Sequence, residues 1–390
     1  MQKTHKLYEK DAYQTDFEGV VLAVTEEKNG YAVVLNQTLF FPEEAGQKSD
    51  LGYLGEAKVL SVTLADGIIT HHTDKPLPLG ATVSGKIDFA ERYRNMQNHT
   101  GEHIVSGLFK RLYNYDNFGF HLGREDVTID IMGELTREDI LRVERLANQA
   151  VYDNLPVLLH YPTPEEAAGL SYRSKIEIKE DLRLVEIPDI DLCACCAPHV
   201  KRTGEIGVIK LLDFIRYKGG VRIHMHCGTD ALRDYHARYE AVAHIAQALS
   251  LKQSELAEGF DRFYRSYEER GAEIAALKAA LAKEKAAHIA KGDEILCLFE
   301  KENDPVFLRE YALCAMESHG GTVCLCAKKE EGVYAYILVS EDMDFKADLP
   351  RINGALSGRG GGRGTSAQGQ FAATEEEISA FFASFTPTKK

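Results

Sequence analysis

The sequence predicts an α+β protein assembled from several parts. Three observations indicate this: short apolar runs between turn residues near the N-terminus, a long middle stretch with helical spacing, and alternating strand and helix patterns near the C-terminus. A chain of 390 residues is long enough for two to three domains. We expect a small β-barrel domain (1–90), an α/β domain (91–228), a helical coiled-coil linker (229–291) and a C-terminal α/β domain (292–390).

The composition is that of an ordinary globular protein, with 44% hydrophobic and 27% charged residues. A net charge of -14 argues against a general nucleic-acid coat, although a local basic site for one RNA remains compatible. We expect no membrane span and no signal peptide, because no apolar run is long enough. The eight cysteines do not resemble a secreted disulfide framework, so we expect a reducing cytoplasm.

Residues 1–90 are predicted to form a small antiparallel barrel. Short apolar runs are separated by turn residues such as Lys28-Asn29-Gly30 and Ala65-Asp66-Gly67. The polar segment 41–52 lies between them, and its simplest interpretation is an inter-strand loop. The expected strands are 19–24, 31–35, 38–41, 57–64 and 67–71.

A helix is predicted from Asp88 to Lys110, and it carries two histidines four residues apart. This spacing places the imidazoles of His99 and His103 on one face, one turn apart, where both can bind one ion. Two exposed histidines would give the same pattern. Glu102 does not directly follow His99, as a metalloprotease motif requires, so that class is disfavoured. Glu102 is either a proton shuttle or part of a solvated helix face, and we expect the latter.

A second motif, Cys195-x3-His199, offers a thiolate and a third imidazole. Together with the two helical histidines it would complete a tetrahedral zinc set. Two rival interpretations use the neighbouring cysteines. Cys193 and Cys196 could form a redox pair, although Pro198 does not suggest the helix start that such a motif needs. A thiolate site that includes Cys227 would leave the two helical histidines unused.

The elements between these motifs are predicted from local patterns. Paired strands are expected at 118–123 and 127–131, and a strand at 182–187 enters the cysteine cluster. Thr136 caps a helix that extends to Asn154.

The stretch 231–289 has apolar residues mostly three and four apart, which is typical of a long helix or helical hairpin with coiled-coil character. Gly259 and Gly271 are expected to interrupt it. Its apolar seam must be buried either within the chain or in a homodimer, and the sequence leaves both open.

From residue 294 onward the pattern is α/β, with strands expected at 295–299, 322–326 and 334–339 and helices at 305–318 and 375–385. A glycine-rich loop is expected at 358–369. Its glycines would let the backbone approach a phosphate, and Arg359 and Arg363 supply planar donors. It lacks the GxxxxGK[ST] pattern, so a nucleotide-triphosphate loop is not expected. A flexible surface loop is the alternative.

In this order, the motifs resemble the editing domain of alanyl-tRNA synthetase and its free-standing relatives, the alanyl-tRNA editing proteins. Segment 41–52 resembles the glycine-rich segment of this family, and 203–207 and 220–223 match two further motifs. Two glycines of the first segment are Glu44 and Ala45 here, and Cys196-Ala197-Pro198 replaces the usual Gly-Gly-Thr. Segment 358–369 resembles the glycine-rich motif of the DHHA1 domain, which serves RNA binding.

The resemblance implies specific roles for individual residues. It implies that zinc is bound by His99, His103, Cys195 and His199. It implies substrate-binding roles for Gln47, Asp50, His121 and Arg222, and RNA-binding roles for Arg359, Gly361, Gly362 and Arg363. Gln47 and Glu102 are the catalytic candidates, and no residue is assigned as the general base.

The implied activity is zinc-assisted hydrolysis of the ester in mischarged tRNA(Ala) that carries serine or glycine. Four protein ligands would fill a tetrahedral site, so we expect positioning and electrostatic help to dominate, with Gln47 orienting the amino acid. Threonyl-type tRNA editing and a non-catalytic tRNA-binding protein with structural zinc are the alternatives. A DHHA1-linked phosphoesterase would need an Asp-His-His motif, and a complete synthetase would need an aminoacylation domain. We expect neither.

Overall fold

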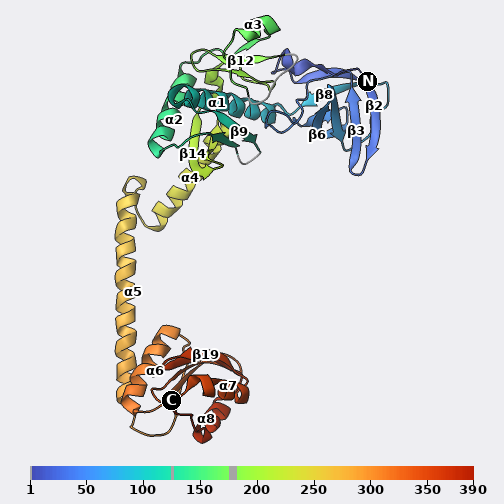
Figure 1. Cartoon of the computed structure of the whole chain (residues 1–390). Helices are drawn as coiled ribbons and strands as arrows, with labels where there is room; N and C mark the ends of the chain where they lie inside the picture. The colour runs from blue at the N-terminus through green and yellow to red at the C-terminus, as the bar shows by residue number, and fades with distance from the viewer. Residues whose placement is uncertain (1, 124–126, 175–181) are drawn as a thin grey trace. The chain divides into compact units, whose positions relative to one another are not determined.

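The protein contains several β-sheets and helices in a mixed α/β arrangement (Figure 1). The computed structural model describes residues 2–123, 127–174 and 182–390. Contacts divide the chain into two compact units, Met1–His244 and Ile245–Lys390. The predicted α+β class is therefore confirmed at the level of mixed secondary structure, and the four predicted domain boundaries remain predictions.

The first unit begins with a closed antiparallel barrel. Its interior is filled by buried apolar side chains such as Val33, Val62 and Ile69. The predicted strand at 38–41 is wrong: only Gln37–Thr38 (β4) is paired, with His5–Lys6 (β1), and 39–41 leave the sheet as fully buried coil. The barrel strands, in spatial order, are β2 (Asp16–Glu27), β3 (Gly30–Leu35), β7 (Ile68–Thr73), β6 (Ala57–Ala65), β5 (Gly52–Leu54) and β8 (Thr82–Ile87).

Helix α1 (Phe89–Tyr113) runs through the middle of the first unit. Asp88 caps it by accepting hydrogen bonds from the backbone N–H groups of Ala90 and Glu91. Every residue from 94 to 109 is buried. The helix therefore has no solvent face in this region, and both of its histidines lie inside the protein.

A four-stranded antiparallel sheet packs one face against α1 and α2 (Arg137–Tyr152). Buried Ile129 and Ile223 lie on this face and contact the core cluster of α1. As predicted, Thr136 caps α2. The sheet consists of β14 (Ile209–Tyr217), β15 (Gly220–Cys227), β10 (Val127–Ile131) and β9 (Asn117–Leu122).

A smaller sheet carries the cysteine segment to α1. It consists of β11 (Leu158–His160), β12 (Leu184–Ile187) and β13 (Asp191–Ala194), and the short helix α3 (Pro164–Ala168) follows β11 in the chain. Gly107 of α1 has no room for a side chain, because a Cβ there would lie 2.5 Å from the carbonyl oxygen of Ile190. This close approach brings Cys195, directly after β13, to the middle of α1. Single 3-10 turns occur at Leu7–Glu9, Thr203–Ile206 and Gln253–Glu255.

Two helices follow the sheet, α4 (Thr229–Ala248) and α5 (Leu256–Ala287). The expected interruptions at Gly259 and Gly271 are wrong, because both glycines lie inside α5. The break instead falls at 249–255, where Ser250 adopts a left-handed φ of 55°. Gly259 is tolerated because its missing side chain makes room for Leu251.

The second unit contains a five-stranded sheet with helices on both faces. The C-terminal part of α5 and α6 (Pro305–His319) cover one face, and α7 (Phe345–Ala355) and α8 (Glu375–Ser384) cover the other. The sequence did not predict α7, which contains Pro350. The strand order is β16 (Leu296–Glu300), β17 (Val323–Glu330), β18 (Val333–Val339), β20 (Ser366–Phe371) and β19 (Arg359–Arg363).

The glycine-rich segment is a β-hairpin, so the predicted loop at 358–369 is wrong. Gly362 and Gly369 have no space for a Cβ because β19 and β20 approach each other closely, and Gly364 has the positive φ of 72° that the turn requires. None of the helices in the described ranges is long and apolar enough to cross a membrane.

Candidate metal centre

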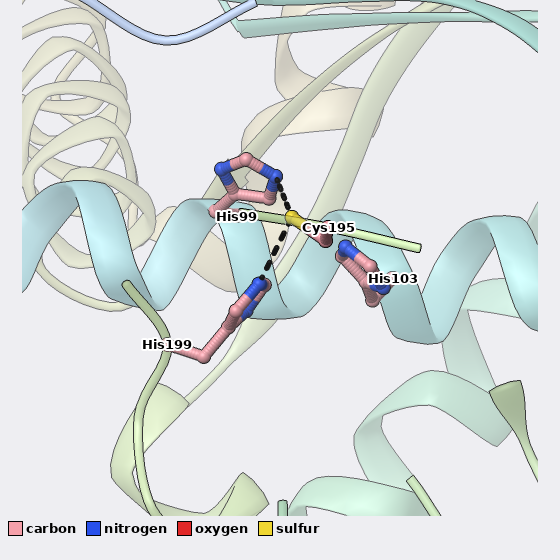
Figure 2. A group of neighbouring side chains, drawn as sticks. All are labelled: His99, His103, Cys195 and His199. Atoms are coloured by element: carbon pink, nitrogen blue, oxygen red, sulfur yellow. Dashed lines mark hydrogen bonds between the residues drawn. The ribbon is translucent and has the colours of Figure 1, made fainter. Parts of the chain in front are cut away.

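Four side chains from two distant parts of the chain meet beside α1 (Figure 2). His99 and His103 lie one turn apart on α1, and Cys195 and His199 come from the segment after β13. Their potential ligand atoms all lie within 4.8 Å of one another. Cys195 Sγ is 3.5 Å from His99 Nε2 and 3.4 Å from His199 Nε2. The structure therefore brings together all four residues that the sequence nominated.

Each histidine is oriented by a hydrogen bond at its other nitrogen. The Nδ1 of His99 lies 3.0 Å from Gln47 Oε1, and the Nδ1 of His199 lies 3.0 Å from Thr100 Oγ1. The Nδ1 of His103 lies 2.9 Å from Asp191 Oδ2. Metal-binding histidines typically engage their second nitrogen in this way, because the bond fixes the tautomer and the ring. The donor set fits a metal such as Zn²⁺.

Asp191 links this centre to a buried ion pair. Its carboxylate also accepts hydrogen bonds from Arg173, with distances of 2.6 Å from Nε and 2.7 Å from Nη2. Burial opposes ionisation of Asp191, but the hydrogen bonds from Arg173 and His103 outweigh it and lower its pKa. Asp191 therefore stays charged and holds the His103 ring.

The electrostatics of the cluster favour a thiolate. Burial alone would raise the pKa of Cys195, but the electrostatic interaction with the imidazoles of His99 and His199 and hydrogen bonds from His103 and His199 lower it well below its usual range. Burial lowers the pKa of His199 to about 3, although the interaction with the Cys195 thiolate works in the opposite direction. Burial also opposes charge on His103, but Cys193, Asp191 and Cys195 raise its pKa well above the ordinary value. A metal ion would displace that proton.

Gln47 reaches the cluster from the barrel side. Its side chain is 1% exposed, and its Nε2 has no hydrogen-bond partner. The backbone N–H of Leu122 donates to the carbonyl oxygen of Gly46 at 2.7 Å, which ties this segment to β9. Gly46 has a φ of 75°, and a Cβ there would lie 2.4 Å from the carbonyl oxygen of Phe120. Glycine is thus required at 46 to place Gln47.

Asp50 has a structural position rather than one in the cluster. It forms an ion pair with Arg92, and both side chains are 0% exposed. It also accepts a hydrogen bond from the backbone N–H of Phe41 at 2.6 Å. Asp50 therefore fixes both ends of segment 41–52, and the structure does not support a direct substrate contact.

The structure does not bring His121 or Arg222 to the cluster. The Phe120 ring lies 4.9 Å from the His99 ring, so His121, the next residue on β9, points to the opposite face and is exposed. Arg222 of β15 donates two hydrogen bonds to Asp130, at 2.7 and 2.8 Å, and stacks on Tyr217.

Glu102 does not lie on a solvated helix face, so this expectation is wrong. It is 2% exposed, and its Oε1 accepts hydrogen bonds from Ser106, at 2.8 Å, and from Asn117. Its Oε2 lies 3.9 Å from His103 Nε2. The helical spacing misled here because α1 is surrounded by protein on all sides.

The rival cysteine interpretations find little support. Burial raises the pKa of both Cys193 and Cys196, which disfavours the reactive thiolate that a redox pair needs. Cys227 belongs to neither of the metal-competent groups found in the described ranges. The second such group, His103, Asp191 and Cys193, shares its histidine with the first. No local pattern had pointed to Asp191, Arg173 or Thr100.

The C-terminal candidates lie together on exposed strand β19. Gly361, Gly362 and Arg363 line a cavity of about 610 Å³ that Lys346 and Lys390 also line. Arg359 is exposed at the other end of the strand. This cavity combines several cationic groups with accessible backbone.

The chain is similar in sequence to several known proteins. A family model described as "Threonyl and Alanyl tRNA synthetase second additional domain" matches residues 182–224, which include Cys195 and His199. The alanine–tRNA ligase of Natronomonas pharaonis is 32% identical over 385 residues, which cover 93% of this chain and 41% of that protein. That of Pyrococcus abyssi is 31% identical over 392 residues, covering 95% of this chain and 42% of that protein. This chain thus spans less than half of either ligase.

A relative of similar length is the alanyl-tRNA editing protein AlaX-L of Pyrococcus horikoshii, 29% identical over 395 residues that cover 96% of both chains. The segment that matches the second-additional-domain model thus carries two of the four residues of the histidine and cysteine centre. The chain is similar to an alanyl-tRNA editing protein over nearly the whole length of both chains, and to alanine–tRNA ligases over part of their length.

Proposed function

We propose that this protein hydrolyses the ester bond of mischarged tRNA(Ala) and releases serine or glycine. One observation carries the proposal: the buried centre of His99, His103, Cys195 and His199, with its oriented rings, in a chain similar over 96% of its length to a protein named for alanyl-tRNA editing. We also propose the four-part division of the chain, which is supported by the separate barrel, the sheet that packs on α1, the helices α4 and α5, and the five-stranded sheet. The free cysteines suit a reducing cytoplasm.

Zn²⁺ is the metal that this donor set fits best, with three imidazole nitrogens and one thiolate sulfur. When bound, Zn²⁺ would supply electrostatic attraction for the ester carbonyl or for the terminal ribose. The protein itself orients the rings through Gln47, Thr100 and Asp191. The amide Nε2 of Gln47 is free to donate a hydrogen bond to the aminoacyl group.

Glu102 acts through His103 in this proposal. One of its oxygens is occupied by Ser106 and Asn117, and the other faces the His103 ring. A carboxylate held in this way is a positioning group, because it has little freedom to reach an ester.

The deacylase proposal predicts that the ligands are required for activity. His103→Ala and Cys195→Ala should each lower the rate of Ser-tRNA(Ala) deacylation by more than about 100-fold and reduce bound zinc, because each removes a donor. His121→Ala is the matched control, because His121 is exposed and points away from the centre. Wild-type rates in a folded, zinc-free double variant would remove the metal from the mechanism.

Two alternatives remain open, and the same assay separates them. The family description names threonyl as well as alanyl synthetases, so release of serine from Ser-tRNA(Thr) but not from Ser-tRNA(Ala) would indicate threonyl-type editing. A tRNA-binding protein with structural zinc would bind the tRNA and release no amino acid. The alternative of a structural zinc is favoured by the four protein ligands, which complete a tetrahedral site and leave no position for water.

We also propose that β19 contacts the backbone of the tRNA. Its glycines expose main-chain groups, and Arg359 and Arg363 with Lys346 add positive charge. Arg363→Ala should weaken tRNA binding roughly tenfold and reduce its salt dependence. Lys328→Ala, at an exposed lysine outside the cavity, should leave both unchanged. Unchanged affinity in Arg363→Ala would exclude this contact.

Finally, we propose a homodimer formed through α5. Seven large hydrophobic side chains of this helix are at least 50% exposed, and all but Tyr264 repeat at alternating steps of three and four or at seven, as in a coiled-coil seam. The helix has 32 residues, about 48 Å of length, so a second copy could cover the whole stripe. The stripe consists of Phe260, Phe263, Tyr267, Ile274, Leu277 and Leu281.

A further inference from the structure

We propose that Glu44 recognises the α-ammonium group of the amino acid to be released. This inference rests on the proposed deacylase function and adds a specificity-determining residue to it. Glu44 occupies a position where the family segment has glycine. Recognition of the ammonium group by this carboxylate would therefore be a feature of this chain rather than of the family pattern.

Among the described residues, three polar atoms near segment 41–52 are buried without hydrogen-bond partners: Tyr8 Oη, Glu44 Oε2 and Gln47 Nε2. Tyr8 is 2% exposed and Gln47 is 1% exposed. Buried polar atoms in native proteins are nearly always paired, so a set without partners in the described part of the chain is suited to bind a polar ligand. A group with donors and acceptors would satisfy all three.

The backbone places Glu44 on the side of the metal centre. Glu44 and Gln47 exchange both backbone hydrogen bonds across a tight turn, at 3.2 and 2.9 Å. Directly paired residues of an antiparallel pair project their side chains to the same face. Because Gln47 extends to His99, the Glu44 carboxylate lies on that same face.

Electrostatic neighbours confirm the position of this carboxylate. Burial raises the pKa of Cys196, and the charges of Cys195 and Glu44 and a hydrogen bond to the Glu44 carboxylate raise it further. Burial likewise raises the pKa of Tyr8, and the charges of Glu9, Cys196 and Glu44 add to this. Glu44 thus lies near Cys196, the residue next to the proposed ligand Cys195, and near Tyr8.

Within the described residues, Glu44 forms no ion pair. Arg92 is committed to Asp50, and Arg183 donates to the backbone carbonyl oxygens of Cys195 and Ala197. A partly buried carboxylate without a cation binds one favourably. The aminoacyl ester provides a primary ammonium on the carbon next to its carbonyl group. The donor of Gln47 and the hydroxyl of Tyr8 would then face the remaining polar atoms of the amino acid.

The test uses the full-length protein and a neutral substrate of the same size. Treatment with nitrous acid replaces the ammonium of Ser-tRNA(Ala) by a hydroxyl group and gives the glyceric acid ester. Wild-type protein should hydrolyse the seryl ester roughly 10- to 100-fold faster than the glyceric acid ester, beyond their chemical difference in protein-free buffer. Glu44→Gln should remove this preference by slowing the seryl reaction alone.

Glu43→Gln is the matched control, because Glu43 is exposed and carries the same charge one residue away; it should keep the full preference. Glu44→Asp keeps the charge and should retain part of the preference, which separates recognition from folding. If Glu44→Gln keeps the wild-type preference, or if wild-type protein shows none, the inference is overturned while the deacylase proposal stands. If wild-type protein hydrolyses neither ester, the deacylase proposal itself fails, and with it this inference.

Discussion

At the scale of single residues, the difference between Gln47 and Asp50 shows how neighbouring polar groups acquire different roles. Gln47 is directed at His99, whereas Asp50 is fully used by Arg92 and a backbone N–H. The two look equally polar and equally close to the turn in the sequence. Only the fold separates a residue that can face the substrate from one that fixes the segment.

His71 gives a residue-scale prediction about pH. It is fully buried in the barrel, bonded to Thr38 and to the carbonyl oxygen of Val33, and burial lowers its pKa to about 4. In the unfolded chain, His71 has an ordinary pKa near 6.5. As the pH falls, His71 therefore becomes protonated in the unfolded chain before it does so in the folded protein. The contribution of neutral His71 to the free energy of unfolding is therefore fully present above about pH 6.5. It decreases as the pH falls from about 6.5 to about 4, by a total on the order of 3 kcal/mol.

Unfolding free energies measured from pH 7.5 to 4.5 check this prediction. His71→Gln, which keeps hydrogen-bonding capacity without titrating, should show a shallower decline than wild type across this window. The exposed residue His5 provides the control, and His5→Gln should follow the wild-type slope. Equal slopes for wild type and His71→Gln would show that His71 is not buried as a neutral group.

Each pair of ligand residues could be found from its local spacing, because two histidines four apart on a helix lie on one face and Cys195-x3-His199 is equally compact. Spacing alone did not show that the two pairs meet, and it was the resemblance to the editing family that joined them. Asp191, Thr100 and Arg173 could not be predicted, because they meet the cluster through tertiary contacts only. Glu102 and His121 were misjudged for the same reason: the sequence does not say which side of an element is covered.

At the scale of elements, α1 explains why helical patterns were informative about position but not about burial. Its buried stretch contains Arg94, Asn95, Gln97 and Asn98 as well as apolar residues. Arg94, Gln97 and Asn98 hydrogen-bond to residues outside the helix, and Asn95 accepts a hydrogen bond from Arg94. An amphipathic pattern presumes one solvent face, which α1 lacks here. The prediction of a loop at the glycine-rich segment was wrong for a different reason. Glycine usually weakens a strand, but here it permits the close approach of β19 and β20.

The exposed stripe of α5 yields the element-scale prediction. Leu277→Glu should weaken self-association at least tenfold, because it places a charge in an apolar seam. Ala272→Glu is its control, since Ala272 is exposed on the opposite side of the helix. Sedimentation equilibrium checks both. A monomeric wild-type protein at tens of micromolar would contradict the proposed interface.

At the scale of the whole chain, the two units divide the proposed task. The first unit holds the histidine and cysteine centre, and the second holds the exposed glycine-rich strand. The sequence predicted this separation because each motif lies within one stretch of the chain. It did not predict the contact-based division at 244 and 245, which falls inside α4 rather than at a composition change.

The central claim is that one metal ion is held by three imidazoles and one thiolate, and X-ray absorption at the zinc edge of the purified protein tests it most directly. The account predicts three nitrogen neighbours at about 2.0–2.1 Å and one sulfur at about 2.3 Å, with one zinc per chain. Cys195→Ser should remove the sulfur signal. A spectrum with two or more sulfur neighbours, or with oxygen and nitrogen alone in the wild-type protein, would contradict the proposed centre.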